Sequence, residues 1–135
     1  MKTGNIKSLS MEYIVYAPAK DVFDALTMPS LVVQWSGEEG MISDQVDGTF
    51  KWFGGWVAGT VKKFKPSELL VFTWKPSEWD KKTDPTTVTI KFQPHEAGTK
   101  LLLNHEGFPN TDEAEKHKSG WVDFVFEPLN EFFTR

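Results

Sequence analysis

TDEAEKHKSGWVDFVFEPLNEFF, residues 111–133, is the stretch that decides the fold, because it is the one long helical pattern in a chain that otherwise alternates mainly like strands. At about 100° per residue, Asp123, Glu127 and Asn130 gather on one side of such a helix. The opposite, apolar arc spans roughly 200°, against ~100° or a little more for an ordinary surface helix. Its members are Trp121, Val122, Val125, Phe126, Leu129, Phe132 and Phe133, with Phe124 at the edge. So wide an arc needs cover on both flanks, which a curved antiparallel sheet supplies, and a cavity often remains between such a sheet and its helix.

The segment before this helix has a two-residue period from Met41 to Gly107, which is typical of strands. Within it, Asp47-Gly48 is a strong hairpin signal, and clusters of Gly, Pro and Ser mark other turns. The expected strands cover residues 41–46, 49–53, 56–65, 69–74, 86–93 and 99–107. Consecutive hairpins of this kind predict an antiparallel meander.

A further strand and two short helices precede the meander. Residues 8–17 alternate imperfectly, as expected of a strand that is partly covered on both faces. Pro18 suits the first turn of a helix that ends at Pro29, and Gly37 is a natural left-handed cap for a second helix over residues 30–36. The predicted fold is therefore α+β in the order β-α-α-β6-α, a helix-grip arrangement of about seven strands wrapped round the long C-terminal helix. The first strand can close onto either edge of the sheet.

Length and composition exclude several classes of protein. We expect residues 1–135 to form a single domain that buries a core without disulfides or metal. The absence of cysteine removes any thiol nucleophile or Cys-based zinc site, and the sequence carries no cofactor motif. A net charge of −4 with both signs interspersed makes nucleic acid a poor partner. No apolar run approaches the ~18 residues that a membrane span needs, so we expect a cytoplasmic protein.

The unusual feature of the composition is its aromatic content, with 6 Trp and 11 Phe against 2 Tyr. Rings on the sheet and on the long helix can line a cavity as well as fill a core, and for any single ring core packing is the alternative. Large rings around a few polar groups are the usual form of a small-molecule site. The residues predicted to line the cavity are Trp35, Phe50, Trp52, Trp56, Phe72, Trp74, His105, Trp121, Phe124 and Val125.

Three histidines are the candidates for polar chemistry. His105 shares a strand face with two leucines and is expected to point at the cavity, where it could anchor a polar ligand head or accept a proton. A satisfied core or rim histidine is the alternative. We interpret His117 as a helix-surface residue or a partner of Glu113, with a role in the cavity as the alternative, and His95 as a solvated turn residue. Neither a set of metal ligands nor a nucleophile motif accompanies them, so no catalytic residue and no metal site is predicted.

Trp79 and Pro128 depart from the pattern around them. Trp79 lies in the polar loop KPSEWDKK, where an exposed Trp can mark a protein-contact site; folding back onto its own loop is the alternative. Pro128 lies inside the long helix and should kink or break it, at a cost of ~3 kcal/mol or more unless packing compensates. We therefore expect the first half of the helix to face any ligand and the half beyond Pro128 to seal the core.

Several short fragments, in their order and spacing, resemble those of a known family. They are Ala17-Pro18, Val22-Phe23-Asp24-Ala25-Leu26-Thr27, Trp35, Asp47-Gly48-Thr49-Phe50, Gly59-Thr60-Val61, Leu69-Leu70-Val71-Phe72-Thr73-Trp74, Gly98-Thr99, His117 and Gly120-Trp121. The chain resembles the Bet v 1-like, START-related (SRPBCC) helix-grip superfamily. Within it, the chain resembles the bacterial stand-alone relatives of the C-terminal domain of the activator of heat-shock-protein-90 ATPase. The resemblance runs almost end to end and implies the fold, but this superfamily hosts many activities.

Two functions from different classes follow from these observations. The ring-rich elements predict a non-enzymatic protein that binds a hydrophobic or amphipathic small molecule or lipid between the sheet and the C-terminal helix. The resemblance implies instead an interaction module for a chaperone or another stress-response partner. A weaker alternative is a cyclase or hydrolase that uses cavity residues such as His105.

Overall fold

The computed structural model describes residues 7–135. Within them, seven strands form one antiparallel sheet in the spatial order β1-β7-β6-β5-β4-β3-β2. The strands are β1 (Ser8–Val15), β2 (Met41–Ile42), β3 (Thr49–Trp52), β4 (Val57–Lys65), β5 (Leu69–Pro76), β6 (Thr86–His95) and β7 (Gly98–Glu106). The predicted meander is confirmed, and β1 closes onto β7, with Ser8 opposite Glu106 and Val15 opposite Thr99.

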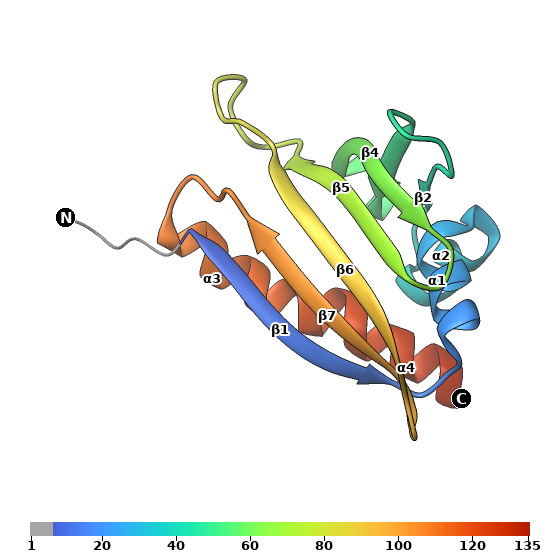
Figure 1. The fold of residues 1–135 in the computed structure, drawn as a ribbon. Coiled ribbons are helices and arrows are strands. Elements are labelled where there is room, and N and C mark those ends of the chain that lie inside the picture. The colour runs from blue at the N-terminus through green and yellow to red at the C-terminus, as the bar shows by residue number, and fades with distance from the viewer. Residues whose placement is uncertain (1–6) are drawn as a thin grey trace.

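The helices cover one face and one end of this sheet. They are α1 (Ala19–Thr27), α2 (Pro29–Ser36), the short 3-10 turn η1 (Phe53–Gly55), and a C-terminal helix in three parts, α3 (Thr111–Gly120), η2 (Trp121–Phe126) and α4 (Glu127–Thr134). Figure 1 shows the C-terminal helix, in orange and red, running along one face of the curved sheet, while α2 contacts both η2 and α4. The predicted α+β helix-grip fold and its element order are confirmed.

The connection between β2 and β3 differs from the prediction. β2 ends at Ile42 instead of Val46. Asp47, with a φ of 69°, donates its backbone N–H to the carbonyl oxygen of Val61 at 2.8 Å, so the chain folds across to the neighbouring strand β4. Asp47-Gly48 therefore forms a turn inside a longer loop between β2 and β3. It does not form a two-residue hairpin, because the backbone N–H of Asp47 is bonded to Val61 in β4.

One face of the sheet forms most of the core. Along β5, β6 and β7, buried and more exposed residues alternate, so every second side chain points toward the helix. The last two parts of the C-terminal helix, η2 and α4, contribute four buried side chains, those of Trp121, Val125, Phe126 and Leu129. The space between the sheet and the helix is therefore largely filled by side chains.

Pro128 changes the winding of the C-terminal helix without ending it. The helix runs on through Pro128 to Thr134 (Figure 1). The stretch Trp121–Phe126 is π-helical, and the N–H of Glu127 donates to the carbonyl oxygen of Val122, five residues back. Pro128 has no N–H, and its ring crowds the preceding turn. A wider, π-helical turn before the proline makes room for the ring and lets the helix continue.

Candidate functional site

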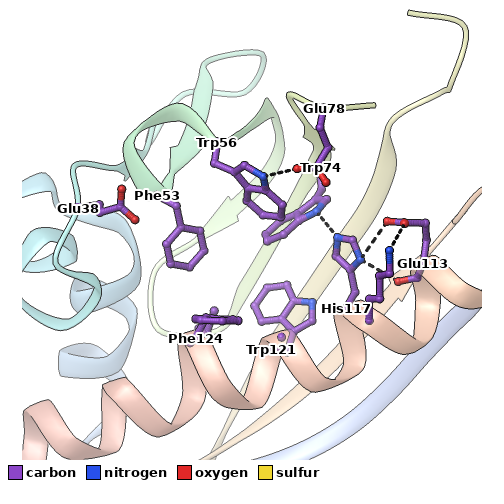
Figure 2. Close-up of a pocket in the computed structure, with 12 residues that line it drawn as sticks. Glu38, Phe53, Trp56, Trp74, Glu78, Glu113, His117, Trp121 and Phe124 are labelled. Atoms are coloured by element: carbon purple, nitrogen blue, oxygen red, sulfur yellow. Dashed lines mark hydrogen bonds and ion pairs between the residues drawn. The ribbon is translucent and has the colours of Figure 1, made fainter. Parts of the chain in front are cut away.

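A pocket of about 550 Å³ opens to solvent where α3 and η2 meet the turn η1 and the end of β5. Figure 2 shows Trp121 and Phe124 on the helix, facing a second group of rings that belongs to the sheet side. The apolar wall consists of Phe53, Trp56, Trp74, Trp121, Phe124 and Val125. The polar and small residues that complete the lining are Glu38, Glu78, Glu113, Lys116, His117 and Gly120.

Local backbone geometry brings this wall together. Gly54 and Gly55 have φ values of 66° and 93°, which residues with a side chain rarely adopt, and the turn they allow carries Phe53 and Trp56 to the pocket. Trp74 points inward at the regular two-residue period of β5. The helix side of the wall comes from η2, and π-helical segments are frequent at functional sites.

The aromatic wall is continuous. The ring centroids of Trp56 and Trp74 lie 6.3 Å apart with planes at 82°, and those of Trp74 and Trp121 lie 5.2 Å apart with planes at 33°. Such offset and edge-to-face pairs contribute about 0.5–1.5 kcal/mol beyond the burial of area. At the mouth, Trp56 is 38% exposed and Phe124 is 65% exposed. The mouth therefore offers apolar surface to a binding partner.

The indole N–H groups of the wall all have partners within the protein. That of Trp56 donates to Glu78 Oε1 at 2.7 Å. That of Trp74 donates to His117 Nε2 at 3.1 Å, and that of Trp121 donates to His105 Nδ1 at 3.0 Å. The donors are used before any ligand arrives, so the tryptophans present ring carbon to the pocket.

His105 lies behind the wall, fully buried and outside the pocket lining. Because an indole N–H can only donate, His105 Nδ1 is unprotonated and the ring proton is on Nε2, which lies 2.7 Å from Thr86 Oγ1. Thr86 Oγ1 donates in turn to the carbonyl oxygen of Trp74 at 2.9 Å. Burial, with a smaller contribution from His117, lowers the pKa of His105 to about 2. The ring is therefore a neutral, fully satisfied core group, the alternative considered from sequence.

His117 lines the pocket and has the opposite tautomer. Its Nε2 accepts from Trp74, and its Nδ1 donates to the carbonyl oxygen of Glu113 at 2.8 Å. The carboxylate of Glu113 lies further away, with Oε1 at 3.9 Å from Nδ1. Burial lowers the pKa of His117, against the opposing effect of the backbone bond to Glu113. The predicted partnership with Glu113 exists, but His117 is buried and does not lie on the helix surface.

Residues 7–135 contain neither a metal-binding cluster nor a helix able to span a membrane. No three His, Cys, Asp or Glu side chains in this part of the chain are placed to hold a metal ion. Its helices all fall short of the length and apolar character that a bilayer crossing requires.

Residues 16–134 match the model of the family described as "Activator of Hsp90 ATPase homolog 1-like protein". The chain belongs to this family. The family match and the helix-grip fold of similar solved structures confirm the resemblance seen in the sequence.

Several proteins are similar to this member of the family. A solved structure from Mesorhizobium loti is 26% identical, with a TM-score of 0.78, over 93% of this chain and 96% of the other. The structure of an Hsp90 activator from Plasmodium falciparum is 27% identical, with a TM-score of 0.78, over 96% of each chain. An activator of 90 kDa heat shock protein ATPase homolog from Dictyostelium discoideum is 25% identical over 98% of this chain.

The chain spans about a third of the length of the curated relatives it matches. It covers 34% of the Dictyostelium discoideum protein and 38% of an uncharacterized protein of Schizosaccharomyces pombe, to which it is 26% identical. The matched region corresponds to one part of those longer proteins.

The structure brings five of the ten predicted cavity residues into the pocket lining. These are Trp56, Trp74, Trp121, Phe124 and Val125. The other five are buried in the core outside that lining: Trp35, Phe50, Trp52, Phe72 and His105. Strand period indicates which face is inward but not whether other side chains fill the space in front of it. That these ten residues bind a ligand stays a prediction.

Trp35 and Trp52 have a structural task. Their indole N–H groups donate to the carbonyl oxygens of Ala25 and Leu26 at 2.6 and 3.2 Å. These carbonyls belong to the last turn of α1, where no further helical N–H is available to them. The two rings therefore fix the end of α1 against the core.

Seven residues of the lining lie outside the predicted set of ten, namely Glu38, Phe53, Glu78, Glu113, Lys116, His117 and Gly120. For the helix there was a usable signal, because Glu113, His117, Gly120 and Phe124 recur at a spacing of three or four and so share a face. The residues from the loops carry no such spacing.

Trp79, the predicted protein-contact residue, is partly buried against α3. Its indole N–H donates to Glu113 Oε1 at 3.1 Å, and its ring centroid lies 5.9 Å from that of His117. It thus fixes the β5–β6 connection beside the pocket. Its role in contacting another protein stays a prediction.

Proposed function

We propose that this protein binds an amphipathic small molecule, without chemical turnover, in the pocket between the sheet and the C-terminal helix. The observation that carries the proposal is the pocket of about 550 Å³ with its five aromatic rings and polar rim. Sites for small molecules have volumes of about 300–1,000 Å³ and a mainly apolar lining with a few polar groups.

The absence of turnover in this proposal rests on the two histidines. His105 lies outside the lining, and both nitrogens of His105 and of His117 are already hydrogen-bonded. A general base needs a free nitrogen within reach of the proton it takes. The geometry thus gives no support to a cyclase or hydrolase that uses His105.

The wall of the pocket is held by contacts that need no ligand. The tryptophan N–H groups are paired within the protein, and the rings pack on one another. A ligand would therefore meet a preorganised surface, which reduces the free energy lost in ordering side chains on binding.

Titration of ¹⁵N-labelled protein with lipids, isoprenoids and polyketide-like aromatic compounds tests the proposal. We expect saturable shifts of the indole N–H signals of Trp56 and Trp121 and of the backbone amide of Gly120. If compounds of all three classes leave these signals in place, the proposed function is wrong.

Phe124→Ala gives a matched test of the site. Since Phe124 is 65% exposed, we expect the free energy of unfolding to stay within about 0.5 kcal/mol. Affinity for a bound compound should fall by about tenfold, because apolar contact at the mouth is lost. Tyr16→Ala removes another exposed aromatic ring, one outside the pocket lining, and should leave affinity unchanged.

A second function, regulation of an Hsp90-type chaperone, is favoured by the family match and by the similarity to the Plasmodium falciparum and Dictyostelium discoideum proteins. Those two are described as Hsp90 activators or their homologues, and we extend that role to this chain only as a proposal. Titrating the chaperone with this protein while its ATPase rate is measured is the test. An unchanged rate at saturating concentration would count decisively against it.

A further inference from the structure

We propose that the ligand of this pocket is a hydrophobic organic cation, an alkyl- or arylammonium compound. The inference rests on the proposed small-molecule function and narrows it to one chemical class. An apolar body of such a compound fits the aromatic wall, and its charged end fits the rim.

The pocket lining has an excess of negative charge. Glu38, Glu78 and Glu113 contribute three carboxylates, and Lys116 contributes one ammonium group. With His117 neutral, the lining has a net charge of −2. Lys116 Nζ lies 3.4 Å from Glu113 Oε2, so that cation is already matched to one carboxylate. Uncompensated charge beside a low-dielectric wall attracts cations and repels anions more strongly than it does in open water.

The hydrogen-bonding groups of the rim are mainly acceptors. The indole N–H groups of the wall donate to the protein, and His117 uses both of its ring nitrogens. Glu78 accepts one hydrogen bond, from Trp56 to Oε1, among residues 7–135, and an ionised carboxylate has about four acceptor positions. A ligand that donates, as an ammonium group does, finds several acceptors here. A ligand carboxylate finds one charged donor among the lining side chains, the ammonium group of Lys116, which is already paired with Glu113.

The wall itself suits a positive charge. Trp is the side chain that attracts cations most strongly through its ring face, at up to about 6 Å from the centroid. The planes of Trp56 and Trp74 lie at 82° to each other (Figure 2). Trp56 is 38% exposed and Trp74 only 3%, so Trp56 supplies most of the tryptophan surface that a cation can reach at the mouth. Ring faces and carboxylates therefore favour the same sign of charge at one site.

Three naphthalene compounds of similar shape test the inference: 1-naphthylmethylammonium, 1-naphthalenemethanol and 1-naphthoate. Their affinities are measured at pH 7 from the indole shifts of Trp56 and Trp121. We expect the ammonium compound to bind about tenfold more tightly than the alcohol, and the carboxylate to bind most weakly. Salt at about 0.5 M should reduce the ammonium preference, because it screens the rim charges.

The double variant Glu38→Gln/Glu78→Gln removes two rim charges, while the new amide oxygen at position 78 can still accept from Trp56. We expect it to lose the ammonium preference and to bind the alcohol with affinity within about twofold of the parent. Glu115→Gln removes one charge from an exposed position on α3 outside the lining, and should keep the preference.

Two outcomes overturn the cation inference while the proposed small-molecule function stands. One is equal affinity for the ammonium compound and the alcohol, and the other is an ammonium preference that persists in the double variant. If no naphthalene compound shifts the indole signals, the inference also fails. If lipids, isoprenoids and polyketide-like compounds give no shift either, the small-molecule function itself fails.

Discussion

His105 and His117 are held as neutral imidazoles by the donors that surround them. Their ring centroids lie 5.4 Å apart, and their protons are on different nitrogens, Nε2 in His105 and Nδ1 in His117. A second proton on either ring would point at an indole N–H, that of Trp121 for His105 and that of Trp74 for His117. Protonation therefore breaks a buried hydrogen bond as well as placing a charge in the core.

This arrangement predicts that stability falls as the pH is lowered from 7 to 5. Folding lowers the pKa of both histidines, so below about pH 6.5 the unfolded chain binds more protons than the folded protein. The stabilisation is fully present above that pH and is lost as pH falls, for His105 down to about pH 2. Between pH 6.5 and 5, His105 alone should reduce the free energy of unfolding by about 2 kcal/mol. Urea denaturation at several pH values measures this.

Substitution of His117 isolates its share of the pH dependence. His117→Gln keeps a polar side chain but cannot take up a proton in this range, so the fall in stability between pH 7 and 5 should be less steep than in the parent. The same slope in both proteins would show that His117 does not contribute.

For single residues, the sequence predicted which way a side chain points better than what that side chain does. The parity of His105 with its neighbours in β7 correctly placed it on the inward face. Its role depends on Thr86 and Trp121, from another strand and from the helix, and neither lies near it in sequence. A pattern along one strand cannot show that both ring nitrogens already have partners.

Among the elements, the C-terminal helix is joined to the end of β1 by hydrogen bonds of the Asn130 side chain, in addition to the stacking of Phe126 on Tyr13. Asn130 Oδ1 accepts from the backbone N–H of Tyr16, and its Nδ2 donates to the carbonyl oxygen of Ile14, both at 2.9 Å. The sequence placed Asn130 correctly on the polar side of the helix. The polar side faces the end of β1 at this point, so it is an attachment to the sheet and not simply a solvated surface.

Asn130→Ala should therefore lower the free energy of unfolding by about 1–3 kcal/mol, since two hydrogen bonds of about 0.5–1.5 kcal/mol each are lost. Urea denaturation measures the change. Glu131→Ala alters the neighbouring exposed residue and should stay within about 0.5 kcal/mol of the parent. Equal effects of the two substitutions would rule out a specific attachment by Asn130.

Gly120→Ala should stabilise the same helix. Gly120 has ordinary helical angles, with φ −62° and ψ −38°, and within residues 7–135 an added Cβ would meet Phe124 Cδ2 at an unstrained 3.9 Å. Alanine loses less backbone entropy than glycine in a helix, so the free energy of unfolding should rise by about 0.5–1 kcal/mol. A lower melting temperature for the variant would contradict this expectation.

The order of the elements could be predicted because each has its own period, but their irregularities could not. Pro128 correctly indicated a disturbance in the helix, yet the disturbance takes the form of a π-helical stretch before it. Asp47 marked a turn, yet the bond to Val61 in β4 decides the length of β2. In both cases the local sequence pattern shows where the backbone is disturbed, but hydrogen bonds outside that pattern determine the form that the disturbance takes.

For the molecule as a whole, the pocket depends on segments that are far apart in sequence. Its lining comes from the α2–β2 loop, η1, the end of β5, the β5–β6 connection and the helix. The sequence could predict the helix face and the inward strand face, because both repeat regularly. It could not predict that Glu38 and Glu78 reach the same rim, since only the assembled fold brings two loops together.

The long-range contacts also predict that the protein unfolds in one cooperative step. β1 pairs along its length with β7, near the other end of the chain, and the helix attached to β1 through Asn130 packs across the same sheet. The tryptophans gather around the pocket end, so their fluorescence reports on that end, whereas far-UV circular dichroism reports on the whole sheet. Since one connected core joins the two regions, we expect both signals to give the same urea midpoint, with a slope of about 1–3 kcal/mol per M. A fluorescence midpoint clearly below that of circular dichroism would mean that the pocket end opens first, because its aromatic wall is then held less firmly than the strand pairs behind it.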